Sequence, residues 1–249
     1  GPSNTWQCDT VDTGEGMGQF SSLDMDSTGN PWIAYYDATA GYPRIANYTG
    51  SAWSFLLGPV DQPSLDTGKH VSLALDDDGD LHLAYQNVTS GTLAYAEYVG
   101  SGGNCGWDSF NGYKWQCSEI EAMGTPTGYR PMSIGTDEAG YPIIAYQDTT
   151  GGSLAATLKM ARPINGLGPP IPYSGNCGPA FSPPPLPRLS WQCDIIDGGS
   201  NIDEGGSVSL AVDSNGLATI AYHEHRFMLP ASVDSLKVAY QRRTGYLPL

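Results

Sequence analysis

The sequence predicts an all-β fold, a four-bladed β-propeller whose last blade is completed by the N-terminal strand. Three observations predict it: one pattern occurs four times, tryptophan-bearing segments alternate with its copies, and the composition suits short strands. The chain of 249 residues holds 32 glycines, 19 prolines and 15 tyrosines, and only 15% of its residues are charged. Such a composition is typical of many strands joined by tight turns rather than of long helices.

The repeated pattern predicts a β-hairpin in each copy. All copies keep one spacing from Ser to Asp, Gly and Tyr, and they cover residues 22–35, 72–85, 133–146 and 209–222. The Asp-x-x-Gly segment supplies the turn, because Asp caps it through its side chain and Gly takes the positive φ. A third strand follows each hairpin, and after the first three a fourth strand carries a tryptophan: Trp53, Trp115 and Trp191. Four antiparallel strands per repeat indicate propeller blades.

The number of strands predicts how the ring closes. No tryptophan-bearing strand follows the fourth hairpin, whereas residues 5–8 at the start of the chain form a spare one. That strand would complete blade 4 and leave no open sheet edge at the seam. A fragment of a larger propeller is the alternative. We therefore expect one domain over residues 1–249, with blades at about 18–61, 68–122, 128–197 and 205–242, the last completed by residues 4–12.

The tandem copies also carry a resemblance. Residues 133–148 read S-I-G-T-D-E-A-G-Y-P-I-I-A-Y-Q-D. This segment resembles a family of bacterial secreted β-propeller proteins with tandem S-L-A-L-D-x-x-G-x-P-x-I-A-Y-x-D units. The resemblance extends over most of the chain and implies a propeller fold, but it implies no ligand, because such families are mostly without an assigned function.

The five cysteines predict two disulfide bridges and a secreted protein. Blades 2 and 3 each carry a Gly-Asn-Cys segment before Trp-Gln-Cys, whereas blade 1 lacks both cysteines. This joint presence and absence predicts the pairs Cys105–Cys117 and Cys177–Cys193. Disulfides form in oxidising compartments, so we expect an extracellular or cell-surface location. Cys8 is left over, and we expect its partner in a further Gly-Asn-Cys segment beyond one end of this chain.

Charge and hydropathy exclude two classes of partner. The net charge is −15, and a surface this acidic repels phosphate backbones and anionic lipid head groups. We therefore expect neither nucleic acid nor a membrane surface as a partner. No segment approaches the apolar length that crosses a bilayer. Carbohydrates, cations and extracellular proteins stay open as partners.

One ring of side chains is the candidate ligand site. The ends of the second strands and the entry loops would share the top face of the propeller. We expect a ligand there to contact a set of aromatic, amide and charged residues: Tyr36, Asp37, Gln86, Asn87, Tyr129, Arg130, Gln147, Asp148, His223 and Glu224. The oxygens of Asp37, Asp148 and Glu224 could hold Ca²⁺, the candidate ion. Alternatively these carboxylates and Asn87 only cap the turns between the second and third strands.

Blades 3 and 4 contain the departures from the repeat. Residues 161–190 form a proline-rich insertion that either wraps the next blade or docks a partner. His223 and His225 would lie on one face of a strand, where they could share a metal ion or make only packing and surface hydrogen bonds.

Three functions fit these features, and the composition favours the first. It is a non-catalytic binding module, outside the cell or on its surface, for a carbohydrate or protein ligand on the top face. The second is a glycoside hydrolase or lyase that uses two of the carboxylates Asp37, Asp148 and Glu224 as acid and base. The third is a structural subunit that self-associates into an extracellular assembly. No serine–histidine–aspartate or phosphate-binding motif points to another chemistry.

Overall fold

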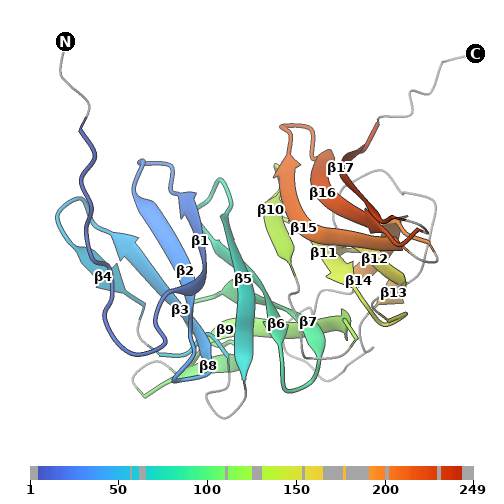
Figure 1. Ribbon diagram of the computed structural model, residues 1–249. Coiled ribbons are helices and arrows are strands. Elements are labelled where there is room, and N and C mark those ends of the chain that lie inside the picture. Colours follow the sequence, from blue (N-terminus) through green and yellow to red (C-terminus); the bar gives the residue numbers. More distant parts are fainter. Residues whose placement is uncertain are drawn as a thin grey trace, which may run out of the picture.

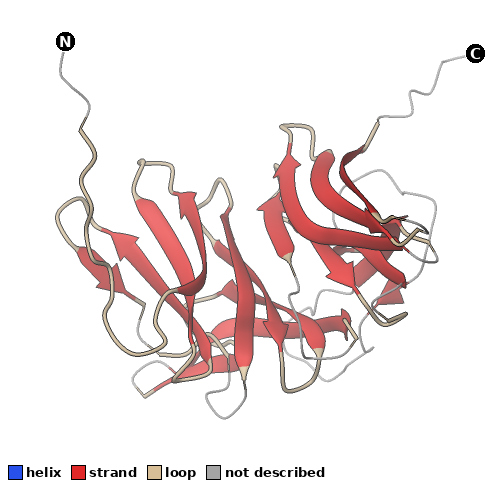
Figure 2. Cartoon of the chain, viewed as in Figure 1, coloured by secondary structure: helices blue, strands red, loops and turns tan. Residues whose placement is uncertain are grey.

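The computed structural model describes residues 5–56, 58–61, 66–109, 112–124, 131–152, 155–164, 176–177, 191–199, 202–228 and 231–242. These residues form β-strands and turns, and no helix occurs among them (Figure 2). The all-β class is confirmed. The described residues contain no helix that is long and apolar enough to cross a membrane.

The strands group into four antiparallel units that follow one another along an arc (Figure 1). Unit 1 contains β1 (Gln19–Met25), β2 (Pro31–Asp37), β3 (Tyr42–Tyr48) and β4 (Trp53–Phe55). Unit 2 contains β5 (Thr67–Leu75), β6 (Leu81–Asn87), β7 (Thr92–Tyr98), β8 (Cys105–Asp108) and β9 (Gly112–Ala122), and β9 lies between β7 and β8.

Units 3 and 4 are joined into one sheet by a short parallel pairing of β12 with β15. Unit 3 contains β10 (Met132–Thr136), β11 (Pro142–Asp148), β12 (Ala155–Pro163), β13 (Asn176–Cys177) and β14 (Trp191–Asp197). Unit 4 contains β15 (Ile202–Val212), β16 (Ala218–Arg226) and β17 (Val233–Tyr240). The proline-rich insertion predicted at residues 161–190 lies mostly outside the described residues.

The repeated aspartate makes the predicted hairpin turn. In unit 1, Asp26 Oδ1 accepts hydrogen bonds from the backbone N–H groups of Thr28 and Asn30, both at 2.9 Å. Gly29 has a φ of 84°, a conformation that costs glycine little. The same bonds occur at the other three turns, whose aspartates are Asp76, Asp137 and Asp213. Each turn therefore folds through a local contact that the sequence pattern alone specifies.

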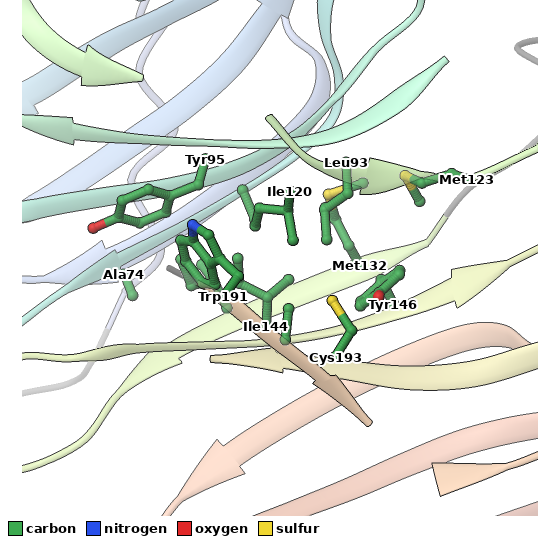
Figure 3. Close-up of a cluster of buried hydrophobic side chains, with 13 residues drawn as sticks. Ala74, Leu93, Tyr95, Ile120, Met123, Met132, Ile144, Tyr146, Trp191 and Cys193 are labelled. Carbon is green, nitrogen blue, oxygen red and sulfur yellow. The ribbon is translucent and has the colours of Figure 1, made fainter. Parts of the chain in front are cut away.

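The core consists of three clusters, one at each interface between successive units. Figure 3 shows the cluster between units 2 and 3, where Trp191 packs edge-to-face on Tyr95 with ring centroids 5.1 Å apart. The other two clusters combine aliphatic residues with Tyr85 and Trp115 between units 1 and 2, and with Tyr222 between units 3 and 4. Apolar burial thus contributes to every interface between successive units, including the one where β12 also pairs with β15.

At each of these interfaces the repeated serine accepts a hydrogen bond from a backbone N–H of the next unit. Ser22 Oγ accepts the N–H of Leu73 at 3.0 Å, so unit 1 is tied to unit 2. Ser72 accepts from Ile134 at 3.1 Å, and Ser133 accepts from Leu210 at 3.0 Å. In each case the donor is the residue directly after the repeated serine of the next unit.

Both predicted disulfides are present. Cys105 is bonded to Cys117, and Cys177 is bonded to Cys193. Cys8 is free and exposed. The bridges are compatible with an extracellular protein.

The predicted closure of the ring is not seen. Residues 5–13 form no strand, and β17 pairs with β16 alone among the described residues. In Figure 1 the N-terminal segment runs along unit 1, far from β17. Asp12 holds it there, because Tyr35 Oη donates a hydrogen bond to Asp12 Oδ2 at 2.5 Å. The sheets therefore form an open arc.

Candidate functional site

A hydrogen bond between a tyrosine and a carboxylate recurs in every unit. The tyrosine is the last residue of the repeat, and its carboxylate partner lies in the segment that leads into the unit. The pairs are Tyr35–Asp12, Tyr85–Asp61, Tyr146–Glu121 and Tyr222–Asp197. Burial raises the pKa of each of these tyrosines, and the neighbouring carboxylate raises it further. Each hydroxyl therefore stays protonated and donates to the carboxylate.

In three units a basic residue lies opposite this tyrosine on the third strand. Arg44 faces Tyr35, Lys159 faces Tyr146, and Lys237 faces Tyr222. The Lys159 ammonium lies 2.8 Å from both Glu121 and Asp148. Burial alone would lower the pKa of Lys159, but the hydrogen bonds to Asp148 and Glu121 outweigh it and raise that pKa. A tyrosine, a cation and two carboxylates thus form one connected group.

The predicted ring of oxygen-bearing residues contributes the second carboxylate of these groups. Asp37, Asn87, Asp148 and Glu224 are all buried. Asp37 caps the turn after β2 through Thr39 and Ala40, and it accepts a hydrogen bond from Arg44 Nε at 2.8 Å. Asn87 and Asp148 accept turn hydrogen bonds in the same way. The turn-capping interpretation thus describes how these three side chains are held.

Two of the remaining predicted residues, Tyr36 and Gln147, bond across junctions between units. Tyr36 Oη donates to Asp66 of unit 2 at 2.5 Å, and Gln147 donates to Asp203 of unit 4 at 2.6 Å. Tyr36, Gln86 and Gln147 are buried, whereas His223 is partly exposed on unit 4. Tyr129 and Arg130 lie outside the described residues.

Unit 2 departs from this arrangement at two linked positions. Ala94 faces Tyr85, where the other units have arginine or lysine. Asn87 stands where units 1 and 3 have aspartate, and its Nδ2 donates to Glu119 at 3.1 Å. The loss of the cation therefore coincides with the loss of the carboxylate that would bind it.

A cavity of about 190 Å³ lies beside the small side chain of Ala94. Its walls combine carboxylates, amides, hydroxyls and the unit 2 disulfide: Asp61, Tyr85, Asn87, Ala94, Asn104, Cys105, Cys117, Ser118 and Glu119. Such polar groups around a concave space can bind a small ligand through several directed hydrogen bonds. The sequence predicted a third strand that contains Ala94. That Ala94 lies opposite Tyr85 became clear only from the register of the strands.

Unit 4 holds a second group that the sequence analysis missed. The carboxylate oxygens of Asp197, Glu204 and Glu224 lie within 4.8 Å of one another. Lys237 binds all three, at 3.2 Å to Glu204 and 2.9 Å to Glu224. Glu204 Oε2 is buried and has no hydrogen-bond partner among the described residues. Glu204 lies on β15 and is part of no recognisable sequence motif. Only the folded structure brings it close to Glu224.

The two glutamates of this group differ in acidity. Burial and the hydrogen bond with Glu224 raise the pKa of Glu204. The hydrogen bonds from Arg226 hold the pKa of Glu224 below its ordinary value. Of the predicted metal ligands, Glu224 thus belongs to this group, whereas Asp37 and Asp148 pair with the cations of their own units.

No family model and no curated protein matches this chain. Among solved structures, an alpha-L-arabinanase from Penicillium chrysogenum, complexed with arabinobiose, is similar over 90% of this chain and 62% of that chain, with 15% identity and a TM-score of 0.54. The polysaccharide lyase Uly1 has 10% identity and a TM-score of 0.43, over 88% of this chain and 57% of that one. A fucose lectin from Kordia zhangzhouensis, in complex with methyl-fucoside, has 12% identity and a TM-score of 0.32, over 57% of this chain and 90% of that one.

The likeness to the arabinanase concerns the fold alone, at this identity, and the chain spans less than two thirds of that enzyme's length. The two other likenesses are too weak to carry an argument. This chain therefore has an all-β, β-propeller-like fold.

Proposed function

We propose that this protein is an extracellular, non-catalytic carbohydrate-binding protein whose ligand enters the cavity of unit 2. The observation that carries the proposal is the replacement of the cation by Ala94, which leaves the cavity open. In unit 3 the same place is filled by Lys159, which binds both adjacent carboxylates.

The walls of the cavity fit a polyhydroxylated ligand. Sugar hydroxyls both donate and accept hydrogen bonds, so they match carboxylate oxygens, amide groups and hydroxyls together. Asp61 and Glu119 would accept from the sugar, whereas Asn87 and Asn104 can also donate to it. The arabinobiose held by the similar arabinanase supports a sugar as the class of ligand. The two disulfides support an extracellular location.

The test converts unit 2 into a copy of unit 3. The double variant Ala94→Lys, Asn87→Asp restores the ammonium and its carboxylate without changing the net charge. We expect it to fold, by circular dichroism and thermal melting, and to lose glycan affinity by about tenfold or more, because the cavity is filled. A glycan array, followed by calorimetry with the best glycan, measures this.

Ser51→Lys is the matched control, because it adds a lysine to an exposed loop of unit 1. It should bind as the wild type does. Undiminished binding by the double variant would contradict the site. Failure of the wild-type protein to bind any glycan would contradict the function.

A glycoside hydrolase or lyase is the second candidate, and the carboxyl pair of unit 4 favours it. Glu204 with a raised pKa could act as an acid beside the ionised Glu224. Both side chains are buried, however, so a sugar would reach them only if unit 4 opened. Turnover of a polysaccharide that Glu204→Gln abolishes, and that Glu119→Gln leaves intact, would select this candidate.

We also propose that units 4 and 1 pack together and close a four-bladed ring. Leu23 of unit 1 is 59% exposed, although its counterpart Leu73 is buried against unit 1. Leu236 of unit 4 is 83% exposed, although its counterpart Leu158 is buried against unit 4. Each open face thus exposes a leucine at a position that is buried at a formed interface.

A cysteine pair tests this closure. At the formed interface of units 3 and 4, a Cβ on Gly135 would lie 3.1 Å from the Val212 side chain. The equivalent pair for closure is Ala211→Cys with Met25→Cys, made in a Cys8→Ser background. An intramolecular disulfide in the monomer is expected, with Gly135→Cys, Val212→Cys as the positive control. A disulfide between two molecules, or none, would contradict closure, and the first would point to self-association.

A further inference from the structure

We infer that His223, His225 and Asp234 form a binding site for a divalent transition metal, of which Zn²⁺ is the best match. His223 and His225 lie two residues apart on β16, so both project from the same face of the sheet. Asp234 lies on the adjacent strand β17, directly opposite His225. Strand pairing alone therefore brings the three side chains together.

The two imidazoles converge on one oxygen atom. His223 Nε2 lies 2.9 Å from Asp234 Oδ1, and His225 Nδ1 lies 2.7 Å from the same Oδ1. Two ring nitrogens and one carboxylate oxygen are a ligand set that zinc uses in proteins, with water in the remaining position. All three side chains are reached by solvent, so an ion can enter.

Two neighbours hold the imidazoles in place. The His225 ring packs edge-to-face on Phe227 with the centroids 4.5 Å apart, which restricts its rotation. Gly206 lies under His223, where a Cβ would come within 2.9 Å of Nδ1. Only glycine leaves room for that ring orientation.

Arg226 on β16 and Lys237 on β17 lie on the other face of the sheet. Side chains alternate along a strand, so Glu224 and Arg226 project opposite to the two histidines. Arg226 and Lys237 both bind Glu224 there. No ammonium or guanidinium of the described residues is paired with Asp234, and its partners are the two histidines. A bound cation would therefore meet no positive charge among the ligands.

This position also departs from the repeat. Tyr36 and Gln147, which stand where His223 stands, bond the next unit through Asp66 and Asp203. His223 instead turns to Asp234 of its own unit. The chain thus uses a junction position for a different contact in unit 4.

The test measures binding of Zn²⁺ alone to the full chain, by calorimetry and by competition with a chromophoric chelator. We expect one ion per chain, with at least about tenfold weaker binding in each of His223→Gln, His225→Gln and Asp234→Asn. Unchanged circular dichroism shows that the variants are folded. Ca²⁺, which prefers oxygen ligands, should bind at least about tenfold more weakly than Zn²⁺.

His70→Asn is the matched control. It removes an imidazole from unit 2, and asparagine tolerates the positive φ of 56° found at His70. This variant should bind Zn²⁺ as the wild type does. Zinc binding that persists in both His223→Gln and His225→Gln would overturn the inference, as would the absence of stoichiometric binding at micromolar zinc.

Discussion

Units 2 and 3 have the same strands, the same tyrosine and a disulfide each, yet only unit 3 has a cation in its polar group. Lys159 binds Glu121 and Asp148, whereas Ala94 leaves a cavity and Asn87 replaces the second carboxylate. A buried carboxylate without its cation is costly, but a neutral amide is not. The difference therefore shows that cation and carboxylate are kept or lost together. It also explains why the proposed ligand site is assigned to unit 2, where the cavity lies.

The largest expected effect comes from removing the cation of unit 3 alone. Lys159→Ala leaves Glu121 and Asp148 without a counter-charge, and we expect the free energy of unfolding to fall by about 3 to 5 kcal/mol. Urea denaturation at pH 7 measures this. Lys159→Ala with Asp148→Asn reproduces the composition of unit 2 and should recover much of the loss. If the single variant were as stable as the wild type, cation and carboxylate would not be coupled.

The disulfides should have similar effects on stability but different effects on binding. Cys105→Ala, Cys117→Ala opens a loop of 12 residues, and Cys177→Ala, Cys193→Ala opens one of 16. We expect each to cost about 3 kcal/mol in chemical denaturation. Only the first bridge lines the cavity, so only its loss should also weaken glycan binding. Equal weakening in both variants would show that the ligand lies elsewhere.

The sequence predicted the hairpins and both disulfides, because they rest on local spacing. The Asp-x-x-Gly turn needs only residues within one copy, as the contacts of Asp26 show. The cavity could not be predicted in this way, because it depends on strand register and on Asp61, which comes from the segment leading into unit 2. Glu204 was missed for the same reason. The sequence analysis placed Asp37, Asp148 and Glu224 in one site. In the structure each of them belongs to a separate group of ion pairs.

Unit 4 extends the comparison, since its cation faces one carboxylate more than Lys159 does. The raised pKa of Glu204 means that the folded chain binds a proton there more tightly than the unfolded chain. The stability from this proton is complete below the ordinary glutamate pKa and is lost as the pH rises through the folded value. Between pH 5 and pH 8 the free energy of unfolding of the wild type should fall by about 1 to 2 kcal/mol more than that of Glu204→Gln.

Glu119→Gln, which removes an exposed carboxylate, is the control for this pH effect. Its profile gives the general effect of removing one carboxylate, against which the effect of Glu204→Gln is compared. Parallel profiles for the wild type and Glu204→Gln would mean that Glu204 titrates normally, and the case for an acid in unit 4 would fail with it.

The smallest effects compare the open ends of the arc with the formed interfaces. Ser72→Ala and Ser133→Ala each remove a hydrogen bond that ties one unit to the next, and each should cost about 1 kcal/mol. Ser209 occupies the same position in unit 4, and Leu23 would be its partner in a closed ring. In an open arc Ser209→Ala changes stability by less than about 0.5 kcal/mol, as is usual at an exposed surface. In a closed ring its cost equals that of Ser72→Ala, so one measurement of unfolding free energy separates the two architectures. Because the serine-to-backbone bond recurs at every formed interface, a cost at Ser209 would identify a fourth interface of the same kind.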